Sequence, residues 1–327
     1  MSNFQVYKKT LPFSLFSFLF DLLGFLVVVG LATAGFFIFA NGGDAGMGIL
    51  GLILGLILGG VLAFLINLFI TNRIKSAQIA MMTKGVSEDN LPDHTFKAGM
   101  QEMKGKFGKI TAFLFITNAI KGIFRQVGKA INSIGTAVGG NTGNVVTSTI
   151  NTGVEILIGY LCDCCLGWIF YRKDINSFKA GCEGAVIFFK HGKTLLRNIG
   201  RIFGMGILSL LLIGGAVTGI LIAVFMQFPA MFDTLRVEIA EIIASGESEL
   251  PAFFATSTGV IVIVSLIIGL VFWSMIHSVF IRPFILTGVL RNFILSGEKD
   301  LPKEADFATL AEKSPKFAKL QQKALEK

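Results

Sequence analysis

The sequence predicts an all-α polytopic membrane protein: a transmembrane helix bundle of about six spans, with amphipathic interfacial helices on its cytosolic side. Three observations lead to this fold class. Of the 327 residues, 53% are hydrophobic and only 15% are charged, whereas soluble domains carry about 25% charged residues. The mean hydropathy is +0.72. Lys and Arg gather just beyond the apolar runs, as the positive-inside rule expects of cytosolic segments. We therefore expect a multi-pass protein of the cell (plasma) membrane with both termini cytoplasmic.

The first apolar run covers residues 11–40 and predicts an uncleaved spanning helix. The small residues LATAG at 31–35 resemble a signal-peptide cleavage site, but the apolar run continues past them. Asp21 falls inside this run, and two interpretations stay open. Its carboxylate either lies within the hydrocarbon, on a small and polar face that contacts other helices, or lies at the interface because the span begins after it.

The second span is expected over residues 46–71, after a tight Asn-Gly-Gly-Asp turn. Its GLILGLILGG segment places Gly51, Gly55 and Gly59 on one helix face at four-residue spacing. Small residues in this pattern allow two helix backbones to pack closely in lipid. The basic residues that follow indicate a cytosolic exit, and residues 74–84 are expected to form an amphipathic helix along the membrane surface.

Residues 109–138 and 145–171 form a central pair of predicted helices joined by a GGNTG turn. Lys121, Arg125 and Lys129 recur every four residues in the first helix. An antiparallel hairpin places Glu155 of the second helix opposite them, so Glu155 is predicted to contact Arg125 or Lys129. The pair either crosses the membrane as a hairpin, or the first helix lies flat on the cytosolic surface.

Residues 160–201 connect this hairpin to the last one and read as a cytosolic hub. Within it, residues 176–191 predict another interfacial amphipathic helix, with Glu183 on the polar side. The last hairpin is expected over about 203–226 and 254–281, with an acidic outer loop between them. The predicted segments are an N-terminal hairpin with its interfacial helix and loop (1–108), a central hairpin (109–171), the hub (172–201) and a C-terminal hairpin with a basic tail (202–327).

The residues give little indication of chemistry. The four cysteines, Cys162, Cys164, Cys165 and Cys182, are weak candidates for a metal site, because structural zinc usually requires paired Cys-x2–4-Cys arms. No Ser-His-Asp set, HExxH motif or phosphate-binding loop is present. We expect no enzyme activity, no cofactor and no resident metal.

The hub resembles the C-terminal half of the choline-transporter-like family. That resemblance covers about residues 160–300 and rests on a Cys-rich helix end followed by a loose pattern in a cytosolic segment, here Cys162, Cys164, Cys165, Asn176, Cys182, Phe189, Arg197, Asn198 and Arg201. It implies a span, an outer loop, a final span and a short helix after the hub. The chain lacks the further spans and the large outer loop of that family, so choline as a substrate is not implied.

Two functional classes remain. A transporter or channel-like protein would use intramembrane polar residues as a path, for which the candidates are Asp21, Asn67, Asn118, Lys121, Arg125, Lys129 and Glu155. A non-transporting scaffold would bind anionic lipid or a protein partner through basic amphipathic segments. The expected partners are membrane lipid and a membrane protein, which includes a second copy of this chain. Nucleic acid is not expected, because the net charge of +8 follows membrane topology.

Overall fold

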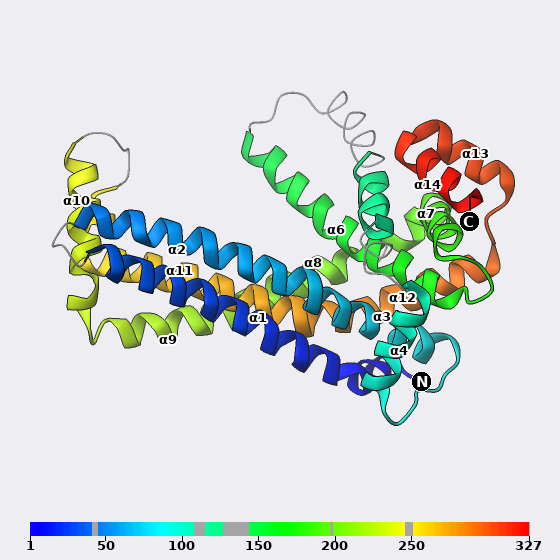
Figure 1. Cartoon of the computed structure of the whole chain (residues 1–327), viewed down its shortest axis with the longest axis horizontal. Helices are drawn as coiled ribbons and strands as arrows, with labels where there is room; N and C mark the ends of the chain where they lie inside the picture. The colour runs from blue at the N-terminus through cyan, green and yellow to red at the C-terminus, as the bar shows by residue number, and fades with distance from the viewer. Residues whose placement is uncertain (41–44, 108–114, 127–143, 197–198, 246–250, 327) are drawn as a thin grey trace. The chain divides into compact units, whose positions relative to one another are not determined.

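The computed structural model describes residues 1–40, 45–107, 115–126, 144–196, 199–245 and 251–326. Every regular element in these residues is a helix, as the sequence predicts. The chain forms two compact units (Figure 1). Unit 1 contains residues 1–200 and 282–327, and unit 2 contains residues 201–281. The segment boundaries expected from hydropathy at 108, 171 and 201 divide the chain differently and stay a prediction.

Four helices of the described residues are long and apolar enough to cross a membrane. They are Asn3–Ala40, Met47–Ser87, Ile202–Phe225 and Ser257–Lys299. A span needs only about 20 residues, so the helices of 41 and 43 residues extend well beyond the hydrocarbon. Within the most apolar window of the first helix only 11% of residues are buried, as expected for side chains that face lipid. The chain is therefore a membrane protein.

The first hairpin of unit 1 consists of α1 (Asn3–Ala40) and α2 (Ala45–Ile66). Its glycine face packs against α1. A Cβ atom added at Gly51 would overlap the carbonyl oxygen of Gly35, and one added at Gly55 would overlap that of Leu31. One added at Gly59 would lie 2.6 Å from the Cα atom of Val28. The two backbones thus lie in direct contact, which is how helices associate where no hydrophobic effect drives them together.

At the end of α2 the helix widens into a π-helical segment, η1 (Asn67–Thr71), and continues as α3 (Asn72–Ser87). Such segments commonly bend a helix or re-aim its faces. In α3 the whole run from Ser76 to Thr83 is buried. This differs from the expectation of an interfacial helix over 74–84. The helices α1, α4 (Thr95–Phe107) and two helices described below, α6 and α12, all pack against α3.

The helical domain of unit 1 is built around α3, α6 (Asn144–Tyr171), α7 (Ser177–Leu196) and α12 (Arg282–Lys299). Its centre is filled by fully buried side chains: Met81, Met82, Trp168, Ile169, Ile187 and Phe293. Gly297 of α12 allows the Trp168 ring to approach the helix backbone, since an added Cβ would lie 2.5 Å from that ring. Such dense interdigitation is typical of a soluble core.

Shorter helices complete this domain. They are α4, the described helical residues 115–126, α13 (Glu304–Lys313) and α14 (Pro315–Leu325). Ser314 lies between the last two and caps α14, because its hydroxyl accepts a hydrogen bond from the Phe317 N–H. Both α13 and α14 pack on α7. The helix predicted over 176–191 is therefore covered by other helices of the domain, whereas the sequence pattern favoured a membrane surface.

Unit 2 contains most of α8 (Ile199–Ser209), the π-helical η2 (Leu210–Gly214), α9 (Gly215–Phe225), α10 (Asp233–Ala244), α11 (Ser257–Ile276) and the π-helical η5 (His277–Ile281). Two short 3-10 helices, η3 (Pro229–Phe232) and η4 (Ala252–Ala255), flank α10. The apolar helices α9 and α11 pack on each other. Trp273 donates a hydrogen bond to the Ser209 hydroxyl at 3.0 Å, which ties α11 to α8.

Candidate functional site

Two ion pairs lie where α1, α3, α6 and α12 of unit 1 meet. The Lys75 ammonium is 3.6 Å from the Asp21 carboxylate. The Arg282 guanidinium donates a hydrogen bond to Asp163 at 2.6 Å. Lys75 also lies within electrostatic range of Asp163 and Arg282, so the two pairs are neighbours. We call these four residues the junction cluster.

Small and aromatic residues of α6 fit around the cluster. The Arg282 guanidinium lies over the Tyr160 ring, 5.3 Å from its centroid, a distance at which the ring attracts a cation. Gly159 leaves the space that the guanidinium occupies, because an added Cβ would lie 3.0 Å from one of its nitrogens. The Arg282 side chain is 35% exposed and that of Asp163 25%. The cluster is thus partly open, which fits charged groups near the end of a membrane helix.

A second charged pair joins the helical residues 115–126 to α6. Arg125 donates two parallel hydrogen bonds to Glu155, at 2.8 and 2.9 Å. The contact predicted from the hairpin spacing is therefore present. Both side chains are more than half exposed, so the pair is worth at most about 1 kcal/mol if it lies in water. Lys129, the other predicted partner, lies outside the described residues.

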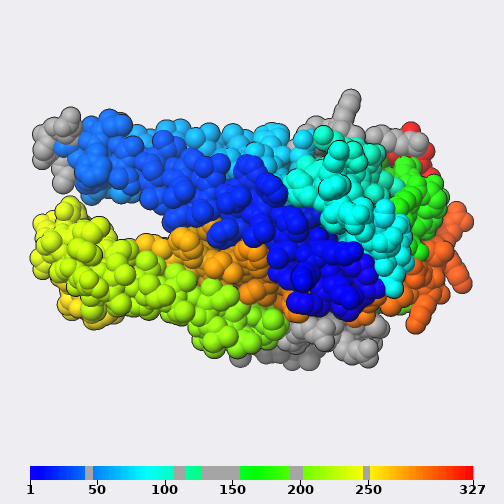
Figure 2. Space-filling view, turned by 90° about the horizontal axis from the view of Figure 1, so that it is seen from below, coloured from blue at the N-terminus to red at the C-terminus, as the bar shows by residue number. Residues whose placement is uncertain are grey.

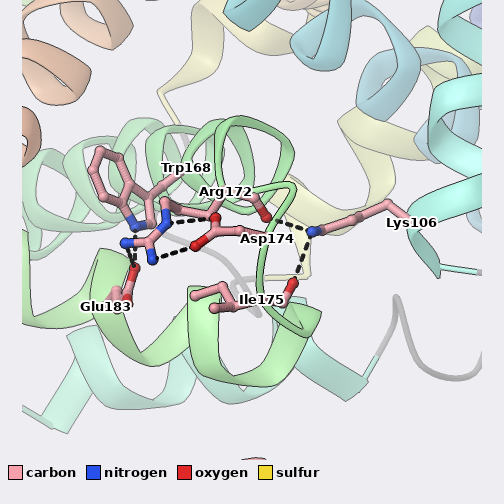
Figure 3. A network of polar contacts seen from close by, with 6 residues as sticks. All are labelled: Lys106, Trp168, Arg172, Asp174, Ile175 and Glu183. Carbon is pink, nitrogen blue, oxygen red and sulfur yellow. Dashed lines mark hydrogen bonds and ion pairs between the residues drawn. The ribbon is translucent and has the colours of Figure 1, made fainter.

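A buried polar network stabilises the turn between α6 and α7 (Figure 3). Trp168 and Arg172 both donate hydrogen bonds to the same oxygen of Glu183, at 3.0 and 2.8 Å. Arg172 also forms a bidentate pair with Asp174. Lys106 of α4 donates to the main-chain oxygens of Arg172 and Ile175. We call this set the turn network; the Arg172 side chain joins the turn to α7, and Lys106 joins the turn to α4.

The turn network perturbs two carboxyl groups in opposite directions. Burial raises the pKa of Glu183, and its bonds to Trp168 and Arg172 offset this only in part. The exposed Asp174 has its pKa lowered to about 2, mainly because its carboxylate accepts hydrogen bonds from Arg172. The sequence placed Glu183 on the polar, outward side of its helix. That was wrong, because its side chain is only 9% exposed and accepts hydrogen bonds from Trp168 of α6 and Arg172 of the turn.

The four cysteines lie in the interior of the helical domain, and all are free thiols. Cys164 and Cys165 are fully buried, and burial raises the pKa of both thiols. Gly184 of α7 lets α6 approach closely, since an added Cβ would lie 3.2 Å from Cys165. Among the described residues no group of three or more His, Cys, Asp or Glu side chains is arranged to hold a metal ion. These cysteines act in the structure as small core residues.

The structure brings three of the path candidates together, because Lys121 lies within electrostatic range of Glu155, which pairs with Arg125. Asp21 belongs to the junction cluster, and Asn67 is exposed in η1. Asn118 and Lys121 are exposed on the helix that carries Arg125. Sequence reasoning missed Asp163 and Arg282, although each is a single charged residue at the edge of an apolar run. That isolation was the available signal for their pairing.

Comparison with protein-family models, with curated proteins and with solved structures found no match for this chain. The resemblance of the hub to the choline-transporter-like family therefore stays a prediction.

Proposed function

We propose that the protein is a non-transporting membrane scaffold, in which apolar spans anchor a helical domain at the cytosolic face of the cell membrane. One observation carries this proposal. The charged residues that would line a transport path are neutralised in pairs: Asp21 by Lys75, and Glu155 by Arg125. A conducting path needs such groups around a shared polar space. The helical domain instead has a dense core suited to holding a rigid surface.

The topology that we propose has four spans and places both termini in the cytosol. Expected spans over 109–138 and 145–171 would give six. The C-terminal half of α6 is buried from Cys164 to Phe170 by α3, α7 and α12, so it offers no apolar surface to lipid there. A cytosolic position also keeps Lys173 on the side that the positive-inside rule favours. Labelling of Lys173 by a membrane-impermeant reagent from outside intact cells would contradict both topologies.

The scaffold's binding surface is a basic ridge, defined as Lys121 and Lys316, Lys319 and Lys323 of α14. Residues 115–126 and α14 lie side by side: Ser314 donates a hydrogen bond to Gln126 at 2.7 Å, and the Lys323 ammonium lies 3.7 Å from the centre of the Phe115 ring. All four ridge lysines are exposed. Because α14 packs on α7 and α13 rather than on α1, we propose that the ridge faces the cytosol and binds an acidic segment of a protein partner.

The test of the non-transporting role is a flux assay in proteoliposomes. The wild-type protein, Glu155→Gln and Asp21→Asn are reconstituted at equal density and compared with empty vesicles for leak of protons, potassium and chloride. The proposal expects equal leak in all four preparations. Flux above that of empty vesicles that either substitution abolishes would overturn it.

The ridge is tested with a fluorescein-labelled peptide of alternating Glu and Leu, by anisotropy against the full chain in nanodiscs. We expect salt-sensitive binding that weakens at least about tenfold in Lys316→Gln/Lys319→Gln/Lys323→Gln, since each exposed contact is worth up to about 1 kcal/mol. The control variant is Lys104→Gln/Lys179→Gln/Lys299→Gln, which removes the same charge from exposed positions elsewhere. Equal loss in both variants would mean that only net charge matters, and the ridge assignment would fail.

Transport is the second candidate, and the junction cluster is the observation that favours it. Two opposite-charge pairs adjoin at the inner ends of membrane helices, an arrangement found in proton and ion relays. The same flux assay decides between the two functions, because Asp21→Asn breaks one pair of the cluster. A proton flux lost in Asp21→Asn but kept in Glu155→Gln would assign a transport role to the cluster.

A further inference from the structure

A pocket of about 750 Å3 lies between the first turns of α1 and the beginning of α4. Figure 2 shows these segments side by side, α1 in dark blue and α4 in cyan. Both belong to unit 1. The pocket is lined by Lys8, Lys9, Pro12, Pro92, Asp93, His94, Thr95, Phe96 and Lys97. Neither the junction cluster, the turn network nor the basic ridge contributes to it, so it is a separate feature of the molecule.

The lining of the pocket is basic. Lys8 and Lys9 come from α1, His94 from the turn before α4, and Lys97 from the first turn of α4; Asp93 is the one acidic residue among them. The three lysine side chains are exposed, and none of them has an ion pair among the described residues. The first turn of a helix also presents main-chain N–H groups without intrahelical partners, which favour a bound anion. The charge of the pocket thus selects an anionic group.

The pocket opens onto an apolar face of α1. Phe96 packs against Phe16, with 4.6 Å between ring centroids. Phe16, Leu19 and Leu23 are exposed and follow Pro12 at three- and four-residue spacing, so they continue one side of the helix. Lys9 and Leu19 are separated by about 15 Å along the helix axis at 1.5 Å per residue. Cations therefore lie at one end of a continuous apolar track that enters the candidate span.

Close packing holds the walls of the pocket in place. Phe13 and Val6 of α1 are completely buried against α3 and α4. Gly99 of α4 makes room for the Phe13 ring, since an added Cβ would lie 2.6 Å from it. The Thr95 hydroxyl donates a hydrogen bond to the Pro92 carbonyl at 2.9 Å and fixes the start of α4. The lysines thus extend from a pre-formed concave surface.

We propose that this pocket binds the phosphate headgroup of one anionic glycerophospholipid, with its acyl chains along the Pro12–Phe16–Leu19–Leu23 face of α1. A soluble phosphate would use the lysines but leave the apolar track unoccupied. A phospholipid uses both, because its charged and apolar parts are joined in the same order as the two surfaces. The site shares no residue with the basic ridge, so this proposal does not depend on the acidic partner proposed for the ridge.

Native mass spectrometry of the full chain, released from micelles that contain equal amounts of phosphatidylglycerol and phosphatidylcholine, tests the headgroup site. We expect the wild type to retain one phosphatidylglycerol in preference to phosphatidylcholine. In Lys8→Gln/Lys9→Gln/Lys97→Gln, the retained fraction should fall at least about tenfold, since each lysine near an anionic lipid surface is worth about 1 kcal/mol. The matched control, Lys104→Gln/Lys179→Gln/Lys299→Gln, should retain the lipid as the wild type does. Retention in the pocket variant equal to the wild type would overturn the proposal.

Two further arms separate the lipid from a soluble anion. Phe16→Ser/Leu19→Ser removes the apolar track and keeps every lysine, so it should also lose the retained lipid. Inorganic phosphate at millimolar concentration should not displace the lipid from the wild type. Displacement by phosphate together with full retention in Phe16→Ser/Leu19→Ser would assign the pocket to a soluble phosphate instead. Unchanged thermal midpoints, read with a thiol-reactive dye on the buried cysteines, verify that each variant is folded.

Discussion

The α1–α2 hairpin and the helical domain belong to the same compact unit, yet they are held together by different forces. In the hairpin, large apolar side chains such as Leu19, Ile57 and Leu58 point outward and are more than half exposed. Contact is made by glycine faces that bring two backbones together. In the domain, apolar side chains point inward around Trp168, and a buried carboxylate joins two helices. Because lipid surrounds the hairpin, small residues make its helix contacts. In the domain, large apolar residues make the contacts instead.

The π-helical η1 lies between the lipid-exposed part of this long helix and the part that is buried in the domain. On its N-terminal side the buried residues described in α2 are all glycines (Gly48, Gly51, Gly55 and Gly59), whereas on its C-terminal side α3 is buried continuously from Ser76 to Thr83. An ordinary α-helix would carry the same faces forward without change. A π segment rotates the residues that follow it. The lipid-exposed helix therefore becomes a core helix without a break in the chain.

The largest expected effect comes from the centre of the domain. Trp168→Ala should lower the free energy of unfolding by about 3–5 kcal/mol, because it leaves a cavity beside Phe293 and removes a donor from the buried Glu183 carboxylate. The measurement is thermal unfolding in detergent with a thiol-reactive dye, since the four buried thiols all lie in this domain. Trp273→Ala, in unit 2, is the control and should leave the midpoint unchanged. Equal shifts in both variants would contradict the separation of the two regions.

An intermediate effect is expected in the hairpin. Gly55→Leu forces a side chain into the α1 backbone and should cost about 1–3 kcal/mol of helix association, as overpacking does. Gly60→Leu is the matched control, because a Cβ at Gly60 meets no atom within 4 Å. The readout is a disulfide engineered as Gly24→Cys/Ala63→Cys, whose Cβ atoms would lie 3.4 Å apart, close to the usual spacing. The cross-link should form with Gly60→Leu and be lost with Gly55→Leu. In proteins without the engineered cysteines, Gly55→Leu should leave the thiol-dye midpoint of the domain unchanged.

The turn network offers a smaller effect. Glu183→Gln keeps an acceptor oxygen but removes the charge that Arg172 contacts, so we expect a loss of about 1–2 kcal/mol. Arg172 keeps its bidentate pair with Asp174, which limits the loss. Glu312→Gln, an exposed position on α13, serves as the reference in the same dye assay. A midpoint for Glu183→Gln at or above that reference would show that the buried pair does not stabilise the domain, as is known for some buried ion pairs.

The smallest effect concerns surface pairs between α7 and α13. Lys190 lies 3.0 Å from Asp306 and also contacts Asp300. The pKa of Asp306 is lowered, first by the Lys303 main-chain N–H and then by Lys190. A carboxyl whose pKa falls on folding stabilises the protein above its unfolded value of about 3.9. That contribution is lost as the pH falls through the lower, folded pKa.

Lys190→Gln should therefore reduce stability at pH 6 and matter less at pH 3, with a difference below about 1 kcal/mol because the pairs are exposed. The dye midpoints of the wild type and the variant, each compared at pH 6 and pH 3, measure it. If the midpoints of the wild type and the variant differ by as much at pH 3 as at pH 6, these carboxylates are not the source of the difference.

The sequence by itself determined the membrane class, because an apolar run of span length has few alternatives in water. It also determined the glycine face of α2 and the Arg125–Glu155 contact, since both follow from helical spacing within neighbouring segments. Only the tertiary structure decided where the amphipathic helices lie. A helix with one apolar face can meet lipid or protein equally well, and in α3 and α7 part of the cover comes from helices distant in sequence. The same holds for Arg282 with Asp163, and for Lys9 and Lys97 in one pocket: long-range packing brings these residues together, and no local pattern specifies the partner.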